Sequence, residues 1–80
     1  MESKVKEIFI NALEISAGEF TSEISMQNNA AWDSLSQLKI IVDLEETFDI
    51  SFNEDEMLKL TSYHNIVNII KDKYARKNQP

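Results

Sequence analysis

WDSLSQLKIIVDLEETF, residues 32–48, decides the fold, because a polar linker gives way there to an amphipathic helical pattern. Asp33 or Ser34 can serve as the N-cap, and Gln37 follows Ser34 at the spacing of a capping box. The apolar residues recur at the intervals that one buried helical face requires. The pattern therefore predicts a helix over residues 34–48 whose buried side chains are Leu35, Leu38, Ile41, Val42 and Phe48.

Ser34 places a hydroxyl group at the start of this helix. Backbone N–H groups there lack helical partners, and the helix macrodipole is positive at that end. A phosphate attached to the hydroxyl would be stabilised in this position. The alternative is that Ser34 only caps the helix, as most serines at such boundaries do.

A first helix is predicted over residues 2–15 by its apolar spacing, with an end near Gly18, where glycine offers a C-terminal cap. The connection over residues 19–32 is long for a compact domain. We therefore expect it to be held over the core by its three large apolar side chains, Phe20, Ile24 and Met26.

The C-terminal third of the chain predicts a short helical turn over residues 54–58 and one more long helix. Thr61 or Ser62 can cap that last helix. Its buried stripe is predicted to be Tyr63, Ile66, Val67, Ile70 and Tyr74. Residues 75–80 are expected to form a frayed tail.

Length and composition limit the class of protein. Eighty residues allow one domain, and a single Gly and a single Pro leave few turn signals, which favours an all-α fold. The chain has no Cys, so it offers neither a disulfide nor a thiol nucleophile. We find no apolar run long enough for a membrane span and no signal-peptide pattern, so we expect a cytoplasmic protein.

Charge is unevenly distributed along the chain. The net charge of −6 disfavours nucleic acid as a partner, because phosphate binding needs a basic face. Residues 43–56 contain no Lys or Arg but seven acidic side chains, Asp43, Glu45, Glu46, Asp49, Glu54, Asp55 and Glu56. This acidic surface would steer basic partner proteins, or it is simply a solvated helix face.

Enzyme and metal sites find little support. A hydrolase would need a base for Ser34, and His64 is the single histidine in the chain. Such a site also needs an oxyanion hole, and the sequence offers no Gly-rich turn to form one. Asp49, Ser51, Asn53 and Asp55 alternate like the first ligands of a calcium loop. The loop pattern then fails at its sixth and twelfth positions, which are Glu54 and Leu60, so we predict neither catalysis nor a metal site.

The acidic helix and its flanks resemble an acyl carrier protein without a gap over residues 33–62. The matching elements are Asp33-Ser34-Leu35, Leu38, Leu44-Glu45-Glu46, Phe48-Asp49, Glu54-Asp55-Glu56 and Leu60-Thr61-Ser62. In that family the serine of the Asp-Ser-Leu motif carries 4′-phosphopantetheine through a phosphodiester. The resemblance implies a small four-helix bundle with three long helices and one short helix, forming a single carrier domain over residues 1–80.

The resemblance also implies roles around the attachment point. Ser34 would hold the phosphopantetheine, Asp33 would help present Ser34, and Leu35 would contact the cofactor and partner enzymes or lie in the core. Trp32 stands where familiar carriers often have a small residue. We expect its ring to cover the end of the core, with contact to the cofactor or a partner as the alternative.

Ser36 and Lys39 depart from the family pattern, since common carriers tend to have acidic residues at both positions. The change argues against docking onto the enzymes of general fatty-acid synthesis and indicates a carrier dedicated to one pathway. The candidate partner-binding residues are therefore Trp32, Leu35, Ser36, Lys39, Glu45 and Glu46.

The leading hypothesis is a monomeric acyl or aminoacyl carrier that shuttles a thioester-bound intermediate. A phosphopantetheinyl transferase would take the arm from coenzyme A. An acyl or aminoacyl ligase and an acyltransferase or synthase would then act on the cargo, in polysaccharide, polyketide, peptide or lipid synthesis. The alternative hypothesis is a noncatalytic acidic helical adaptor in which Ser34 only caps the helix.

Overall fold

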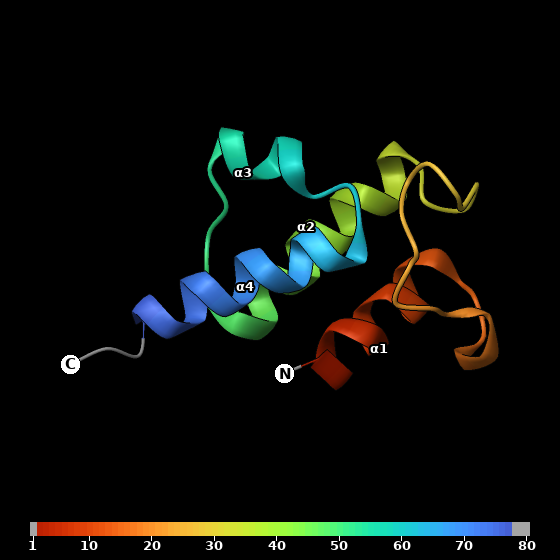
Figure 1. Ribbon diagram of the computed structural model, residues 1–80, viewed down its shortest axis with the longest axis horizontal. Coiled ribbons are helices and arrows are strands. Elements are labelled where there is room, and N and C mark those ends of the chain that lie inside the picture. The colour runs from red at the N-terminus through yellow and green to blue at the C-terminus, as the bar shows by residue number, and fades with distance from the viewer. Residues whose placement is uncertain (1, 78–80) are drawn as a thin grey trace.

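The computed structural model describes residues 2–77, which form four α-helices and one 3₁₀ turn (Figure 1). They are α1 (Glu2–Leu13), η1 (Ala17–Glu19), α2 (Ser34–Phe48), α3 (Glu54–Lys59) and α4 (Tyr63–Lys77). The predicted all-α bundle of three long helices and one short helix is confirmed. Among the described residues, no helix has the length and apolar character needed to cross a bilayer.

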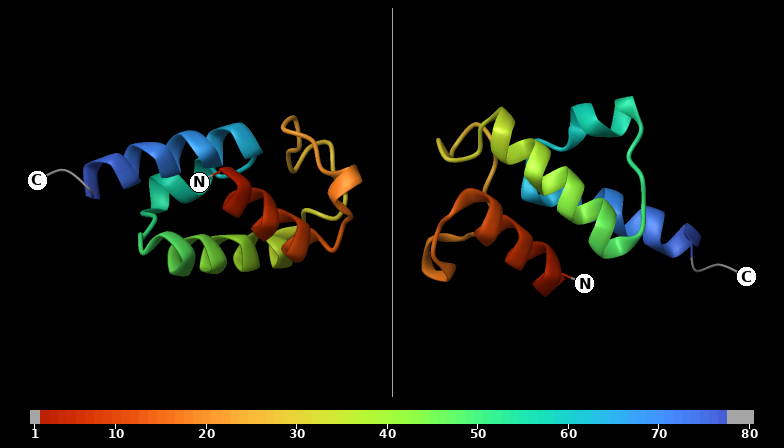
Figure 2. Two further views of the ribbon diagram at one scale, coloured as in Figure 1. Left: turned by 90° about the horizontal axis from the view of Figure 1, so that it is seen from below. Right: turned by 180° about the vertical axis from the view of Figure 1, so that it is seen from behind.

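The core lies between α1, α2 and α4, and the long connection between α1 and α2 closes one end of the bundle (Figure 2). Ile24 in this connection is buried, and Phe20 and Met26 are partly buried against the core, as expected. Backbone hydrogen bonds attach the connection to the start of α4: Tyr63 donates to Ile24 at 3.0 Å and Met26 donates to Thr61 at 2.9 Å.

α1 ends earlier than predicted. Glu14 adopts a left-handed conformation with φ of 54°, and the Ile15 N–H donates to the Ile10 carbonyl at 3.2 Å. This six-residue closure is typical of a helix C-terminus, and here Glu14 takes the position expected of glycine. Gly18 instead lies within η1 at an ordinary φ, so the predicted end of the helix near Gly18 is wrong.

α2 presents a different face to the core than predicted. Ile40, Leu44 and Phe48 are buried and Ile41 is partly buried. The predicted burial of three other side chains is wrong, since the exposed fraction is 78% for Leu35, 62% for Leu38 and 48% for Val42. Successive side chains of a helix turn by about 100° around its axis, so the apolar residues of α2 fall into two stripes on different sides. One stripe contains Ile40, Leu44 and Phe48, and the other contains Leu35, Leu38 and Val42. α1 packs against the stripe that contains Ile40 and Leu44.

α4 differs from the prediction at its C-terminal end. Residues 75–77 are helical where a frayed tail was expected, and residues 78–80 lie outside the described part of the chain. Tyr74 is 44% exposed and not buried, and its ring meets the Phe48 ring edge to face at 6.1 Å between centroids. At the other end, Ser62 is the cap, because its Oγ accepts the Asn65 N–H at 3.2 Å.

α3 is a short helix held by a reciprocal cap. The Asn53 side chain accepts the Glu56 N–H at 2.8 Å, and the Glu56 carboxylate accepts the Asn53 N–H at 2.9 Å. Glu56 also forms an ion pair with Lys73 of α4 at 2.9 Å. Asn53 and Glu56 thus fix the start of α3, and Glu56 also joins this helix to α4.

Candidate functional site

The start of α2 is built by Asp33, the residue before the helix. Its backbone is extended, with φ of −104° and ψ of −172°, and its carboxylate accepts the Ser36 N–H at 2.9 Å. Asp33 is therefore the N-cap, and Ser34 is the first helical residue. The predicted capping box of Ser34 and Gln37 is wrong, because the Gln37 side chain points to other partners.

Ser34 is exposed at the head of a 15-residue helix. Within the part of the chain that the structure describes, its hydroxyl takes part in no hydrogen bond. The cap is supplied by the neighbouring carboxylate, so the helix does not need the serine hydroxyl. The interpretation of Ser34 as the helix cap is thus contradicted, and the exposed hydroxyl is accessible as a nucleophile to an approaching reagent.

Hydrogen bonds lower the pKa of Asp33, first from the Ser36 backbone N–H and then from the Ser36 side chain. These bonds favour the charged form of the carboxyl group. Asp33 is therefore a carboxylate at neutral pH. It places a negative charge at the positive end of the α2 macrodipole, directly before Ser34.

We expect the Asp33 cap to weaken in acid. Because the pKa is lower in the folded chain than in the unfolded chain, the stabilisation is present above the unfolded pKa. It is lost as the pH falls through the folded pKa. Asp33→Asn is the matched control, since asparagine also caps helices but does not titrate. Urea unfolding over a pH series should show the advantage of wild type over this variant shrinking on acidification, and a constant difference would contradict the prediction.

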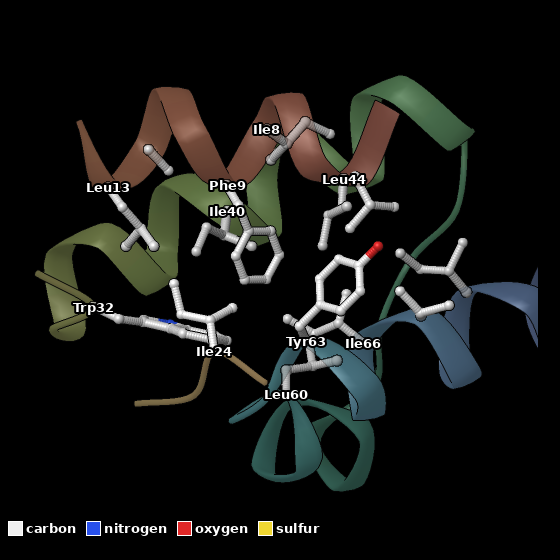
Figure 3. Close-up of a cluster of buried hydrophobic side chains, with 14 of the residues drawn as sticks. Ile8, Phe9, Leu13, Ile24, Trp32, Ile40, Leu44, Leu60, Tyr63 and Ile66 are labelled. Atoms are coloured by element: carbon white, nitrogen blue, oxygen red, sulfur yellow. The ribbon is translucent and has the colours of Figure 1, made fainter. Parts of the chain in front are cut away.

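Trp32 lies under the start of α2 and is 2% exposed. Its ring meets Phe9 edge to face, with 5.0 Å between centroids (Figure 3). The expected role of covering the end of the core is confirmed. The alternative of contact with a partner is wrong for this side chain, because the core already surrounds it.

Gln37 is a site residue that the sequence analysis missed. Its carbonyl oxygen accepts the Trp32 indole N–H at 2.5 Å, and its amide donates to the Leu60 carbonyl at 2.7 Å. The signal was available, since Gln37 shares a helical face with Ile40 and Leu44. A polar side chain on a buried face needs hydrogen-bond partners, and here they join α2 to the segments before it and after α3.

The outward face of α2 brings several predicted residues together. Leu35 and Lys39 are exposed near Ser34, and Leu38 and Val42, which were assigned to the core, lie on the same side. The remaining predicted partner residues differ in exposure. Ser36 is partly buried and its hydroxyl donates to the Ala31 carbonyl at 2.8 Å.

The two glutamates predicted to bind partners also differ. Glu45 is partly buried, and its carboxylate accepts the Phe52 N–H at 3.0 Å. Glu46 is exposed, so its carboxylate is the more accessible of the two. Among the described residues, no group of three or more His, Cys, Asp and Glu side chains is placed to hold a metal ion.

Known proteins identify the family. The family model described as the phosphopantetheine attachment site matches residues 3–70. An acyl carrier protein from Clostridium acetobutylicum is 40% identical over 68 residues, which cover 85% of this chain and 88% of that protein. One from Syntrophus aciditrophicus is 28% identical over 71 residues, 89% of each chain. The solution structure of a holo acyl carrier protein from Geobacter metallireducens matches with a TM-score of 0.81 and 32% identity, over 95% of this chain and 87% of that chain. The chain therefore belongs to the acyl carrier protein family, as a noncatalytic carrier with a phosphopantetheine prosthetic group.

Proposed function

We propose that Ser34 carries 4′-phosphopantetheine and that the chain shuttles a thioester-bound acyl or aminoacyl intermediate between separate enzymes of a dedicated biosynthetic pathway. The single observation that carries this proposal is the exposed Ser34 hydroxyl, which stands free while Asp33 caps the helix. In the same proposal, residues 1–80 form one carrier domain, which acts as a monomer in the cytoplasm, where coenzyme A supplies the arm.

For attachment, the chain itself needs to supply only the Ser34 hydroxyl. The Ser34 oxygen would form a bond to the phosphorus that bears pantetheine, while the pyrophosphate bond of coenzyme A breaks and adenosine bisphosphate leaves. The serine proton would pass to a base of the transferase, which also holds the divalent ion that such transfers use. The start of α2 suits the product, because a phosphodiester there lies at the positive end of the macrodipole.

The bound arm ends in a thiol that carries the cargo as a thioester. The chain contains no Cys, so none of its own side chains can take the acyl group by thiol exchange. Asp33 would hold the first turn of α2 in place beneath the arm, through its bond to the Ser36 N–H. The chain's contribution is thus to present Ser34 and to be recognised by partner enzymes.

We propose the outward face of α2 as the surface on which transferase, ligase and synthase enzymes dock. Leu35, Leu38 and Val42 expose apolar side chains beside Ser34, and such grouped apolar exposure is typical of an interaction site. Lys39 is exposed among them and puts a positive charge where common carriers tend to have an acid. This reversal of charge supports docking onto the enzymes of a dedicated pathway, because mismatched charges at an interface disfavour the wrong partner.

The experiment is intact-mass measurement after incubation of the purified chain with coenzyme A, Mg²⁺ and a broad-specificity phosphopantetheinyl transferase. We expect wild type to gain the mass of one phosphopantetheinyl group. Omission of coenzyme A is the control and should leave the mass unchanged. Absence of any gain in the complete mixture, with the protein folded, would refute the proposed attachment.

Complementation separates the carrier from the acidic adaptor. In cells that lack the chromosomal copy of the gene, Ser34→Ala should fail to restore function if the chain is a carrier, because nothing would hold the arm. An adaptor needs only its folded surface, so the same variant would restore function fully. The adaptor hypothesis also assumed that Ser34 caps α2, and Asp33 occupies that position.

A further inference from the structure

We infer that the cargo remains outside the helical core, so that this carrier is built for short or polar acyl or aminoacyl groups. The inference rests on the proposed attachment at Ser34. A cargo on a flexible arm has two places to go, the solvent side of α2 or the interior behind it. The side chains that fill the interior at the Ser34 end decide between them.

The interior behind Ser34 is occupied by aromatic rings. Phe9 is fully buried and meets three other rings edge to face, with centroids 5.0 Å from Trp32, 5.6 Å from Tyr63 and 6.1 Å from Phe20. Phe20 and Tyr63 also meet each other at 5.1 Å. Figure 3 shows Trp32 at one end of this cluster, next to Ile24, with Leu60 and Tyr63 beside them. An acyl chain entering from Ser34 would have to displace close-packed side chains.

Hydrogen bonds hold the same region closed. Gln37 accepts from the Trp32 indole and donates to the Leu60 carbonyl, so one side chain joins the connection before α2, α2 itself and the segment after α3. Moving these segments apart would strip the Trp32 N–H and the Leu60 carbonyl of their partners. Partly buried polar groups oppose such a separation.

Two clefts lie at the other end of α2. One cleft of about 310 Å³ is lined by Lys4, Thr47, Phe48 and Tyr74. Another of about 380 Å³ is lined by Asp49, Ile50, Ser51, Lys73 and Arg76. Phe48 is fourteen residues beyond Ser34, which is about 20 Å along a helix. Both clefts carry charged side chains and are separated from Ser34 by the length of α2.

The substrate class follows from these placements. A long alkyl cargo held on the solvent side would keep its apolar surface in water, which is unfavourable. A short acyl, hydroxylated or aminoacyl group has little apolar surface to hide, so it loses nothing by staying outside. The filled end of the core therefore favours small or polar cargo over long fatty acyl chains.

The test compares acetyl and octanoyl groups loaded on the phosphopantetheine of the intact chain. Hydroxylamine cleaves both thioesters, and the free acetyl- and octanoyl-pantetheine thioesters serve as references for the reactivity of each chain. For each cargo, the cleavage rate of the protein-bound thioester is divided by that of its free reference. We expect the acetyl ratio and the octanoyl ratio to agree within about twofold, because the fold protects neither cargo. The single Trp32 should keep the same emission spectrum in both forms.

An octanoyl group cleaved about tenfold more slowly than its free reference, with that protection abolished in urea, would place the chain inside the protein and overturn the inference. Intact mass before the reaction keeps the two proposals distinguishable. A loaded chain with a protected octanoyl group refutes only the exclusion of cargo from the core. A chain that cannot be loaded at all refutes the proposed attachment, and the inference falls with it.

Discussion

Ser34→Ala is expected to abolish the phosphopantetheinyl mass gain completely, whereas Ser36→Ala, two residues along the same helix, should retain it. The reason is the different state of the two hydroxyl groups. Ser34 is exposed, while Ser36 is partly buried and donates to the Ala31 carbonyl. Intact-mass measurement of both variants, treated in parallel with wild type, gives the result directly.

The loss in Ser34→Ala should not come from unfolding. Asp33 caps α2 and alanine is a good helix former, so we expect the free energy of unfolding to stay within about 0.5 kcal/mol of wild type. Circular dichroism and urea unfolding check this. A Ser34→Ala chain that still gains the phosphopantetheinyl group would show that another hydroxyl is the attachment point. Equal loss of the mass gain in Ser34→Ala and Ser36→Ala would show that the substitutions impair docking of the transferase, and it would contradict the prediction.

Phe9→Ala is expected to remove a large share of the stability of the chain. Removing a buried Phe side chain costs about 3–5 kcal/mol. A chain of 80 residues has a total stability of about 4–12 kcal/mol, at the usual value per residue. The loss should be near the upper end, because Phe9 is fully buried and contacts Phe20, Trp32 and Tyr63 through its ring faces and edges. Thermal unfolding followed by circular dichroism at 222 nm, the usual helix signal, measures it.

Leu58→Ala is the matched control for this experiment. Leu58 is also a large apolar side chain, but it is 78% exposed on α3. Its truncation should change the free energy of unfolding by no more than about 0.5 kcal/mol, as is usual for surface positions. Similar losses for the two variants would contradict the central position of the Phe9 ring cluster in the core.

The helices could be predicted because their signals are local. Apolar spacing and a cap candidate at the start marked α2 and α4, a short turn was placed close to α3, and the resemblance around Asp-Ser-Leu added the arrangement of the bundle. The same local signals misplaced the end of α1, where Glu14 takes a left-handed conformation that its residue type rarely adopts. The bond from the Ile15 N–H to Ile10 closes the helix there, and no residue pattern announced it.

The candidate site was located by the sequence but not oriented by it. Ser34 could be assigned to the first turn of α2, whereas the choice of Asp33 as the cap depended on backbone angles that two adjacent capping residues leave open. Leu35 could have faced the core or a partner. Only the packing of α1 against the Ile40 side of α2 turned Leu35 outward, beside Ser34.

By itself the sequence determined the helical class, the place of Ser34 at a helix start and the family, because each depends on residues that are near one another in the chain. The tertiary structure decided which of the two apolar stripes of α2 is buried, how Trp32 packs in the core against Phe9, and which groups Gln37 binds. Those outcomes depend on Phe9 and Leu60, which are more than twenty residues from their partners in sequence. Local periodicity carries no information about such distant neighbours, since only the folded chain brings them into contact.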